Sequence, residues 1–127
     1  MYEKFGQFIN GRWQKSSSGE TYDVINPATE EIIGKASKAN KKDIDLCLSS
    51  AKKGLEIWKN TSPWERSKII RKISELMRER KEILAKWLTL EVGKPITEAL
   101  GEGSGAADIF EWSSEEAKRI YGETLQG

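Results

Sequence analysis

Residues 101–105 have the sequence Gly-Glu-Gly-Ser-Gly, the one glycine-rich stretch of the chain that could cradle a phosphate group. A dinucleotide-binding fingerprint places such glycines between a strand and the first turn of a helix, where backbone N–H groups point at the phosphates. Here the stretch lies inside a pattern of apolar residues three and four positions apart, which predicts the middle of a helix. We therefore interpret it as a site of close helix packing.

Nucleophilic or acid–base chemistry has few candidates in this sequence. Cys47 is the single cysteine, it falls on the apolar side of a predicted helix, and the chain has no histidine to activate it. We interpret it as a buried structural thiol. Glu102, Glu115 and Glu116 could be proposed as acid–base carboxylates, but the sequence identifies no partner for them, and we interpret them as surface charges. The residues thus predict no catalytic and no cofactor-binding group.

Residues 65–86 carry eight basic and four acidic residues, a local excess of +4. Such a stretch could bind nucleic acid. The two signs are interleaved, however, so helix pairs such as Glu75 with Arg78 predict a solvated face. The alternative function is a free-standing helical module that binds RNA or an acidic protein through Arg71, Lys72 and Arg78.

Composition and charge favour a soluble, ordered chain of 127 residues. Apolar residues make up 37%, charged residues 32%, and the formal net charge is +1, which provides no overall field to capture nucleic acid or a membrane. No apolar run approaches the roughly 20 residues of a membrane-spanning helix. The lone cysteine and the absence of a signal-like start predict a cytoplasmic protein without nucleic-acid or membrane partners.

The elements that would position these residues begin with a small β region at residues 1–39. Asn10-Gly11 between two short apolar runs predicts a hairpin with a type I′ turn. Residues 22–25 and 32–36 form a second apolar pair around the turn at 26–29, Asn-Pro-Ala-Thr. We expect short antiparallel strands.

Residues 40–122 predict three amphipathic helices. Asn40 is the expected N-cap of the first, with Asp43 at N3. The sequence Ser-Pro-Trp-Glu at residues 62–65 has the form of a capping box and begins the second, which we expect to run for about 30 residues to Val92. The third should end at Gly122.

The predicted third helix has a central stripe of small residues on its repeating face. Gly103, Ala107 and Ser114 recur at three- and four-residue spacing among larger apolar residues. We therefore expect another element to pack closely against its middle.

Several segments, in this order, resemble the opening of the aldehyde dehydrogenase superfamily. They are Phe8–Trp13, Val24–Gly34, Trp58 with Arg66, and Leu90–Pro95. Residues 110–123 are most similar to the succinate-semialdehyde dehydrogenase branch. Family members have an α/β fold of Rossmann type and are roughly four times longer. The resemblance implies that residues 1–127 are the amino-terminal part of the NAD(P)-binding domain, without the catalytic and oligomerisation parts.

In that family a cysteine thiolate attacks the aldehyde, hydride passes to NAD or NADP, and a glutamate-activated water releases the acid. The family pattern places these groups beyond Gly127, and neither Cys47 nor residues 101–105 match them. The resemblance therefore implies an aldehyde substrate and NAD or NADP for the parent enzyme, but no bound cofactor and no activity for this chain alone.

Two further roles follow from the resemblance alone. Some members hold a structural monovalent cation with backbone oxygens and one carboxylate, which correspond here to Val24, Ile25 and Glu91. The third helix borders the substrate tunnel in the family, and its candidates here are Gly105, Ala106 and Ile109. Helices that lack the sheet they should cover are also expected to expose apolar faces, so we expect a homo-oligomer or self-association through them.

Overall fold

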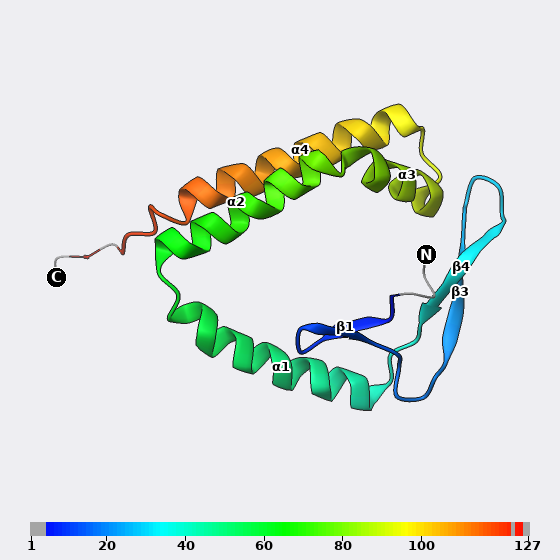
Figure 1. Cartoon of the computed structure of the whole chain (residues 1–127), viewed down its shortest axis with the longest axis horizontal. Helices are drawn as coiled ribbons and strands as arrows, with labels where there is room; N and C mark the ends of the chain where they lie inside the picture. The colour runs from blue at the N-terminus through cyan, green and yellow to red at the C-terminus, as the bar shows by residue number, and fades with distance from the viewer. Residues whose placement is uncertain (1–4, 123, 126–127) are drawn as a thin grey trace. The chain divides into compact units, whose positions relative to one another are not determined.

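The computed structural model describes residues 5–122 and 124–125, with the elements shown in Figure 1. The strands are β1 (Gln7–Ile9), β2 (Arg12–Gln14), β3 (Thr21–Ile25) and β4 (Ile32–Ser37). The helices are α1 (Lys41–Lys59), α2 (Pro63–Glu79), α3 (Lys81–Val92) and α4 (Ile96–Glu116). The chain forms two compact units: the first contains the strands, α1 and residues 88–94, and the second contains residues 61–87 and α4.

Strands β1 and β2 form the predicted hairpin. They pair antiparallel, with Phe8 opposite Trp13. The two turn residues, Asn10 and Gly11, have φ angles of 55° and 75°. A type I′ turn requires positive φ at both central positions, so the prediction made from Asn-Gly is confirmed.

Strands β3 and β4 form a second antiparallel hairpin, with an irregular register between Val24 and Ile25. The turn after β3 is organised by the buried Asn26, whose Oδ1 accepts a hydrogen bond of 2.9 Å from the backbone N–H of Ala28. This is an Asx turn, which explains why Asn precedes Pro at this corner. The predicted strand–turn–strand segment is confirmed.

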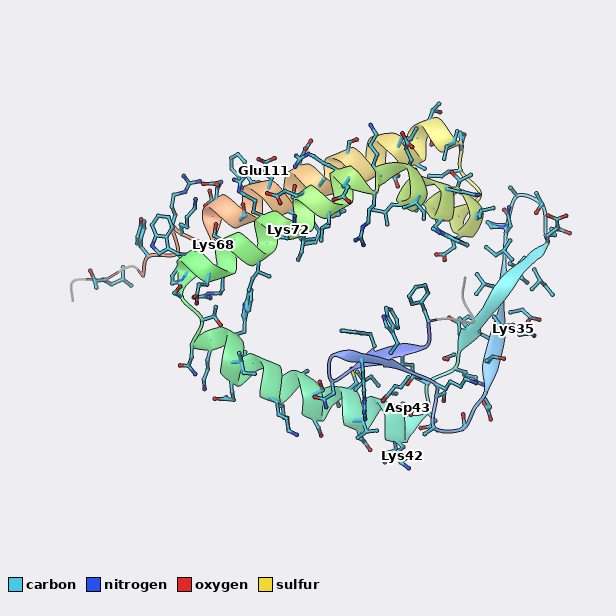
Figure 2. The ribbon with its side chains drawn as sticks, viewed as in Figure 1. Lys35, Lys42, Asp43, Lys68, Lys72 and Glu111 are labelled. Atoms are coloured by element: carbon cyan, nitrogen blue, oxygen red, sulfur yellow. The ribbon has the colours of Figure 1, made fainter. Side chains whose placement is uncertain are left out.

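Asp43 anchors the first unit. Its side chain accepts a hydrogen bond from the backbone N–H of Asn40 at 3.1 Å. The Oδ1 of Asn40 in turn accepts from the backbone N–H of Asp43, so the capping box expected at the start of α1 is present. The same carboxylate accepts from the Ser16 hydroxyl at 2.8 Å and from the Ser17 N–H at 3.0 Å. Asp43 therefore ties the loop after β2 to the first turn of α1 (Figure 2).

The environment of Asp43 favours its ionised form. Burial opposes ionisation, but the hydrogen bonds from Asn40, Ser16 and Ser17 outweigh it and hold the pKa of Asp43 well below its usual range. Ionised Asp43 accepts all of these bonds, whereas a protonated carboxyl would lose part of its accepting capacity.

Helices α2 and α4 lie side by side and form the second unit (Figure 1). They run antiparallel, because Arg71 contacts Glu115 whereas Arg78, further along α2, contacts Asp108. Small residues make their contact: the buried Ser74 donates from Oγ to the carbonyl of Ala107 at 2.8 Å. The close packing expected along the stripe of small residues is confirmed at Ala107 and Ser114, which are completely buried.

The second predicted helix is divided, so the chain has four helices among its described residues instead of three. Helix α2 ends at Glu79, and Arg80 has φ −105° and ψ 14°, outside helical geometry. Residues 78–82 are all charged, Arg-Glu-Arg-Lys-Glu, and they interrupt the apolar stripe that would have kept one helix in register with its partner.

Helix α4 is shorter than predicted, ending at Glu116 and not at Gly122. Beyond it, the N–H groups of Lys118 and Arg119 bond to carbonyls three residues earlier, which tightens the chain into turns. Ile120 and Tyr121 are largely exposed, so no packing extends the helix over these residues.

The Asp43 anchor makes a prediction about acid. The ordinary pKa of Asp in an unfolded chain is about 3.9, and the folded value is lower, so the stabilisation by Asp43 is complete above about pH 4 and is lost as the pH falls toward the folded value. Asp43→Asn should lower the urea midpoint at neutral pH, and the difference from wild type should shrink between about pH 4 and pH 2. Circular dichroism during urea titration measures both midpoints.

A matched control for this variant is Asp45→Asn, which changes an exposed carboxylate two residues along the same helix. It should leave the midpoint near the wild-type value throughout. A constant difference between Asp43→Asn and wild type over the whole pH range would show that the ionised carboxylate is not the anchor.

Candidate functional site

Residues 101–105 lie inside α4, as predicted, and not at a helix start. Their N–H groups are in the interior of the helix, where the backbone ladder uses them, so the segment lacks the free N–H groups of a phosphate loop. The expected close packing is wrong at these positions: apart from the neighbouring residues and backbone of α4 itself, a Cβ added at Gly101, Gly103 or Gly105 would have no described atom within 4 Å. The close contact occurs instead at Ala107 and Ser114.

The three tunnel candidates lie on the side of α4 that does not pack against α2. Gly105 and Ile109 are exposed, Ile109 by 68%, and Ala106 is half-buried. Ala107, in the middle of these positions, is completely buried. Gly105 and Ile109 are each two residues from it, and at 100° per residue they lie on the side of the helix opposite Ala107. The structure thus places Gly105 and Ile109 on an open helix face, with Ala106 at its edge.

The three cation candidates belong to the first unit. Val24 and Ile25 end β3, at the irregular position of the hairpin, and Glu91 lies in the last turn of α3. The two segments meet at Gly93, whose φ is 76° and where a Cβ would lie 3.0 Å from Pro27 and 3.1 Å from the N atom of Ala28. Only glycine suits this conformation and this approach, so Gly93 holds the end of α3 against the turn that follows β3.

Backbone carbonyls and one carboxylate are hard oxygen ligands of the kind that alkali and alkaline-earth ions prefer. The residues described by the structure contain no cluster of three acidic, cysteine or histidine side chains that would hold a transition metal. Occupancy by a monovalent cation remains a prediction.

Cys47 is exposed on α1, so its predicted burial is wrong. Its neighbours on the predicted apolar stripe share this exposure, with Ile44 at 52%, Leu48 at 56% and Leu55 at 60%. The periodicity identified the apolar side of the helix correctly, but within the first unit this side has no cover.

Ion pairs connect the acidic side of α4 to the basic side of α2. Arg71 contacts Glu111 at 2.9 Å and also Glu115, and Arg78 contacts Asp108 at 2.6 Å and Glu111 at 2.7 Å. Hydrogen bonds from Arg71, and then from Arg78, lower the pKa of Glu111. The hydrogen bonds that Arg71 donates to Glu115, and then to Glu111, raise the pKa of Arg71. Glu115 is therefore a helix-pairing residue, not the isolated surface charge that we predicted.

These pairs also bear on the alternative function. Of the three cationic residues proposed to bind RNA or an acidic protein, Arg71 and Arg78 contact carboxylates of α4, and Lys72 contacts Glu75 at 3.2 Å. Figure 2 labels Lys72 on α2 and Glu111 on α4. The predicted pairing of Glu75 with Arg78 is replaced by these contacts. A polyanion would have to displace carboxylates that already neutralise the basic face, which argues against this alternative.

No helix among the described residues combines the length and the apolar character needed to cross a membrane.

Comparison with known proteins gives the family context of this arrangement. Residues 13–127 match the model of the aldehyde dehydrogenase family. The chain is 43% identical over 120 residues to glutarate-semialdehyde dehydrogenase of Pseudomonas putida and 41% identical over 119 residues to the NADP(+) succinate-semialdehyde dehydrogenase of Escherichia coli. Each alignment covers 94% of this chain but 25% of the relative, so the chain spans a quarter of their length.

Solved structures agree with this result. An NADP-dependent enzyme of Escherichia coli matches 98% of the chain with a TM-score of 0.90 at 40% identity, and the alignment covers 26% of that enzyme. Betaine aldehyde dehydrogenase of Staphylococcus aureus, in complex with NAD+, matches 96% of the chain with a TM-score of 0.91 at 28% identity, and the alignment covers 25% of it. The family resemblance seen in the sequence is confirmed: this chain belongs to the aldehyde dehydrogenase family.

Proposed function

We propose that this chain is the amino-terminal part of an NAD(P)-dependent aldehyde dehydrogenase that oxidises an aldehyde to a carboxylic acid. The observation that carries the proposal is the family match over residues 13–127, which includes the β3–β4 hairpin and all four helices. Cys47 is the one cysteine of the chain and leaves no partner for an intramolecular disulfide, in keeping with a cytoplasmic setting.

The names of the relatives support a substrate that carries an acidic group in addition to the aldehyde. Two of them are dehydrogenases of glutarate semialdehyde and succinate semialdehyde, and a third, at 36% identity, is a 3-sulfolactaldehyde dehydrogenase. Each of these aldehydes has a carboxylate or sulfonate at some distance from the reacting carbonyl. We infer a dicarboxylic semialdehyde as the substrate class, with succinate semialdehyde as its representative.

Residues 101–105, the one glycine-rich stretch of the chain, do not fit the pyrophosphate of the cofactor. NAD or NADP would serve as hydride acceptor in the parent enzyme, and NADP(+) and NAD+ both occur among the relatives. The glycines at 101–105 lie within α4, five residues beyond the helix start at Ile96, so they present no cradle for a pyrophosphate. Binding of the cofactor and the chemical step are therefore assigned to parts of the parent enzyme outside this chain, which we propose is inactive alone.

What this chain contributes is scaffold. The ion pairs of Arg71 and Arg78 and the contact at Ser74 fix α4 on α2, which leaves Gly105 and Ile109 facing away from the pair and Ala106 at the edge of that face. We propose that this free face forms one wall of the substrate tunnel. Small side chains at two of the three positions would leave room for a substrate chain.

In the first unit, the carbonyls of Val24 and Ile25 and the carboxylate of Glu91 are proposed to hold a monovalent cation. The support is geometric: Gly93 fixes the end of α3 on the turn that directly follows β3. Such an ion would strengthen the connection between the hairpin and the helix without taking part in the reaction.

The apolar side of α1 is proposed as the surface through which the isolated chain associates with itself. Ile44, Leu48 and Leu55 are all more than half exposed on one side of one helix. Exposed apolar stripes of this kind promote association.

The proposed activity can be tested with a chimera. In it, this chain replaces the matching quarter of the Escherichia coli NADP(+) succinate-semialdehyde dehydrogenase. We expect the chimera to reduce NADP(+) when succinate semialdehyde is added, because 41% identity preserves the scaffold, and we expect the 127-residue chain alone to show no such activity. A folded chimera without activity, or an active isolated chain, would contradict the proposal.

The tunnel wall predicts a selective effect of Ile109→Ala in this chimera. Because Ile109 is 68% exposed in the chain, its truncation should not unfold α4. Loss of about 1 kcal/mol of apolar contact should raise the KM for succinate semialdehyde about fivefold, while the KM for NADP(+) stays unchanged. Thr97→Ala, at an exposed position near the start of α4, is the control. Equal effects of the two variants on both KM values would rule out a wall at Ile109.

The proposed cation site predicts that potassium or sodium raises the thermal midpoint of the chimera relative to choline at equal ionic strength. Glu91→Gln should remove most of this difference, because a neutral amide binds a cation more weakly than a carboxylate does. Glu98→Gln, an exposed change in the first turn of α4, should retain it. Differential scanning fluorimetry gives the midpoints, and an unaltered ion response in Glu91→Gln would refute the site.

Self-association of the isolated chain should depend on the apolar side of α1. Substituting Ile44, Leu48 and Leu55 by Lys should shift the chain from oligomer toward monomer in sedimentation experiments and reduce the binding of a hydrophobic dye. The double variant Asp45→Lys and Ser49→Lys changes exposed positions of α1 and raises the net charge by the same +3, because the Asp substitution also removes a negative charge. It should leave the association in place. A wild-type chain that sediments as a clean monomer without dye binding would overturn the proposal.

A further inference from the structure

We draw no further inference here: the strongest candidate, the hollow of about 600 Å³ in the first unit bordered by Phe5, Trp13, Lys15 and Lys35, lies open, and nothing in the structure shows what covers it.

Discussion

The close approach of α2 and α4 is the contact on which the second unit depends. Small side chains make it possible, because Ser74 lies against the backbone of Ala107 and donates a hydrogen bond to its carbonyl. A larger residue at either position would separate the helices and lengthen the flanking ion pairs of Arg71 and Arg78. The contact therefore determines both the spacing of the helices and which face of α4 is left free. That free face carries Gly105 and Ile109.

Small residues form the helix contact, and the larger apolar side chains remain largely exposed. Within the described part of the chain, the buried apolar residues are Ile9 and four alanines, whereas most large apolar side chains are substantially exposed. Polar anchors take the place of a large core: the serine contact and ion pairs in the second unit, and the buried Asp43 in the first. Such exposure accompanies a chain that spans a quarter of the length of the curated relatives it matches.

Local signals in the sequence predicted the local structure well. Asn10-Gly11 requires positive φ angles at both positions, and Asn40 with Asp43 satisfies the free N–H groups at the start of α1, so each motif determines its own conformation. The break at Arg80 was missed because residues 78–82 contain neither glycine nor proline, although their five consecutive charges interrupt the apolar stripe. The helical period assigned Cys47 to the correct side of α1. Whether that side is buried depends on whether another element packs against it, which the period does not give.

The ion pairs between α2 and α4 could not be predicted because they join residues about 30 to 44 positions apart, and sequence spacing identifies only partners within one helix. The seven-residue spacing of Ser67 with Ser74 and of Ala107 with Ser114 was the available signal for a close helix pair. For the candidate site, the open face of α4 follows from the helical period once Ala107 is known to be buried. Its role as a tunnel wall comes from the family resemblance alone.

We expect the α2–α4 contact to be the most stable part of this chain, whereas the apolar side of α1 lacks cover within the first unit. Hydrogen exchange of the isolated chain, measured by mass spectrometry under conditions where it is monomeric, tests this claim directly. We predict that peptides from the middle of α2 and α4 exchange most slowly, and that peptides from the middle of α1 exchange much faster. Equal protection of α1 and α4 would contradict the greater stability of the α2–α4 pair, because the helix without cover would then be as stable as the paired helices.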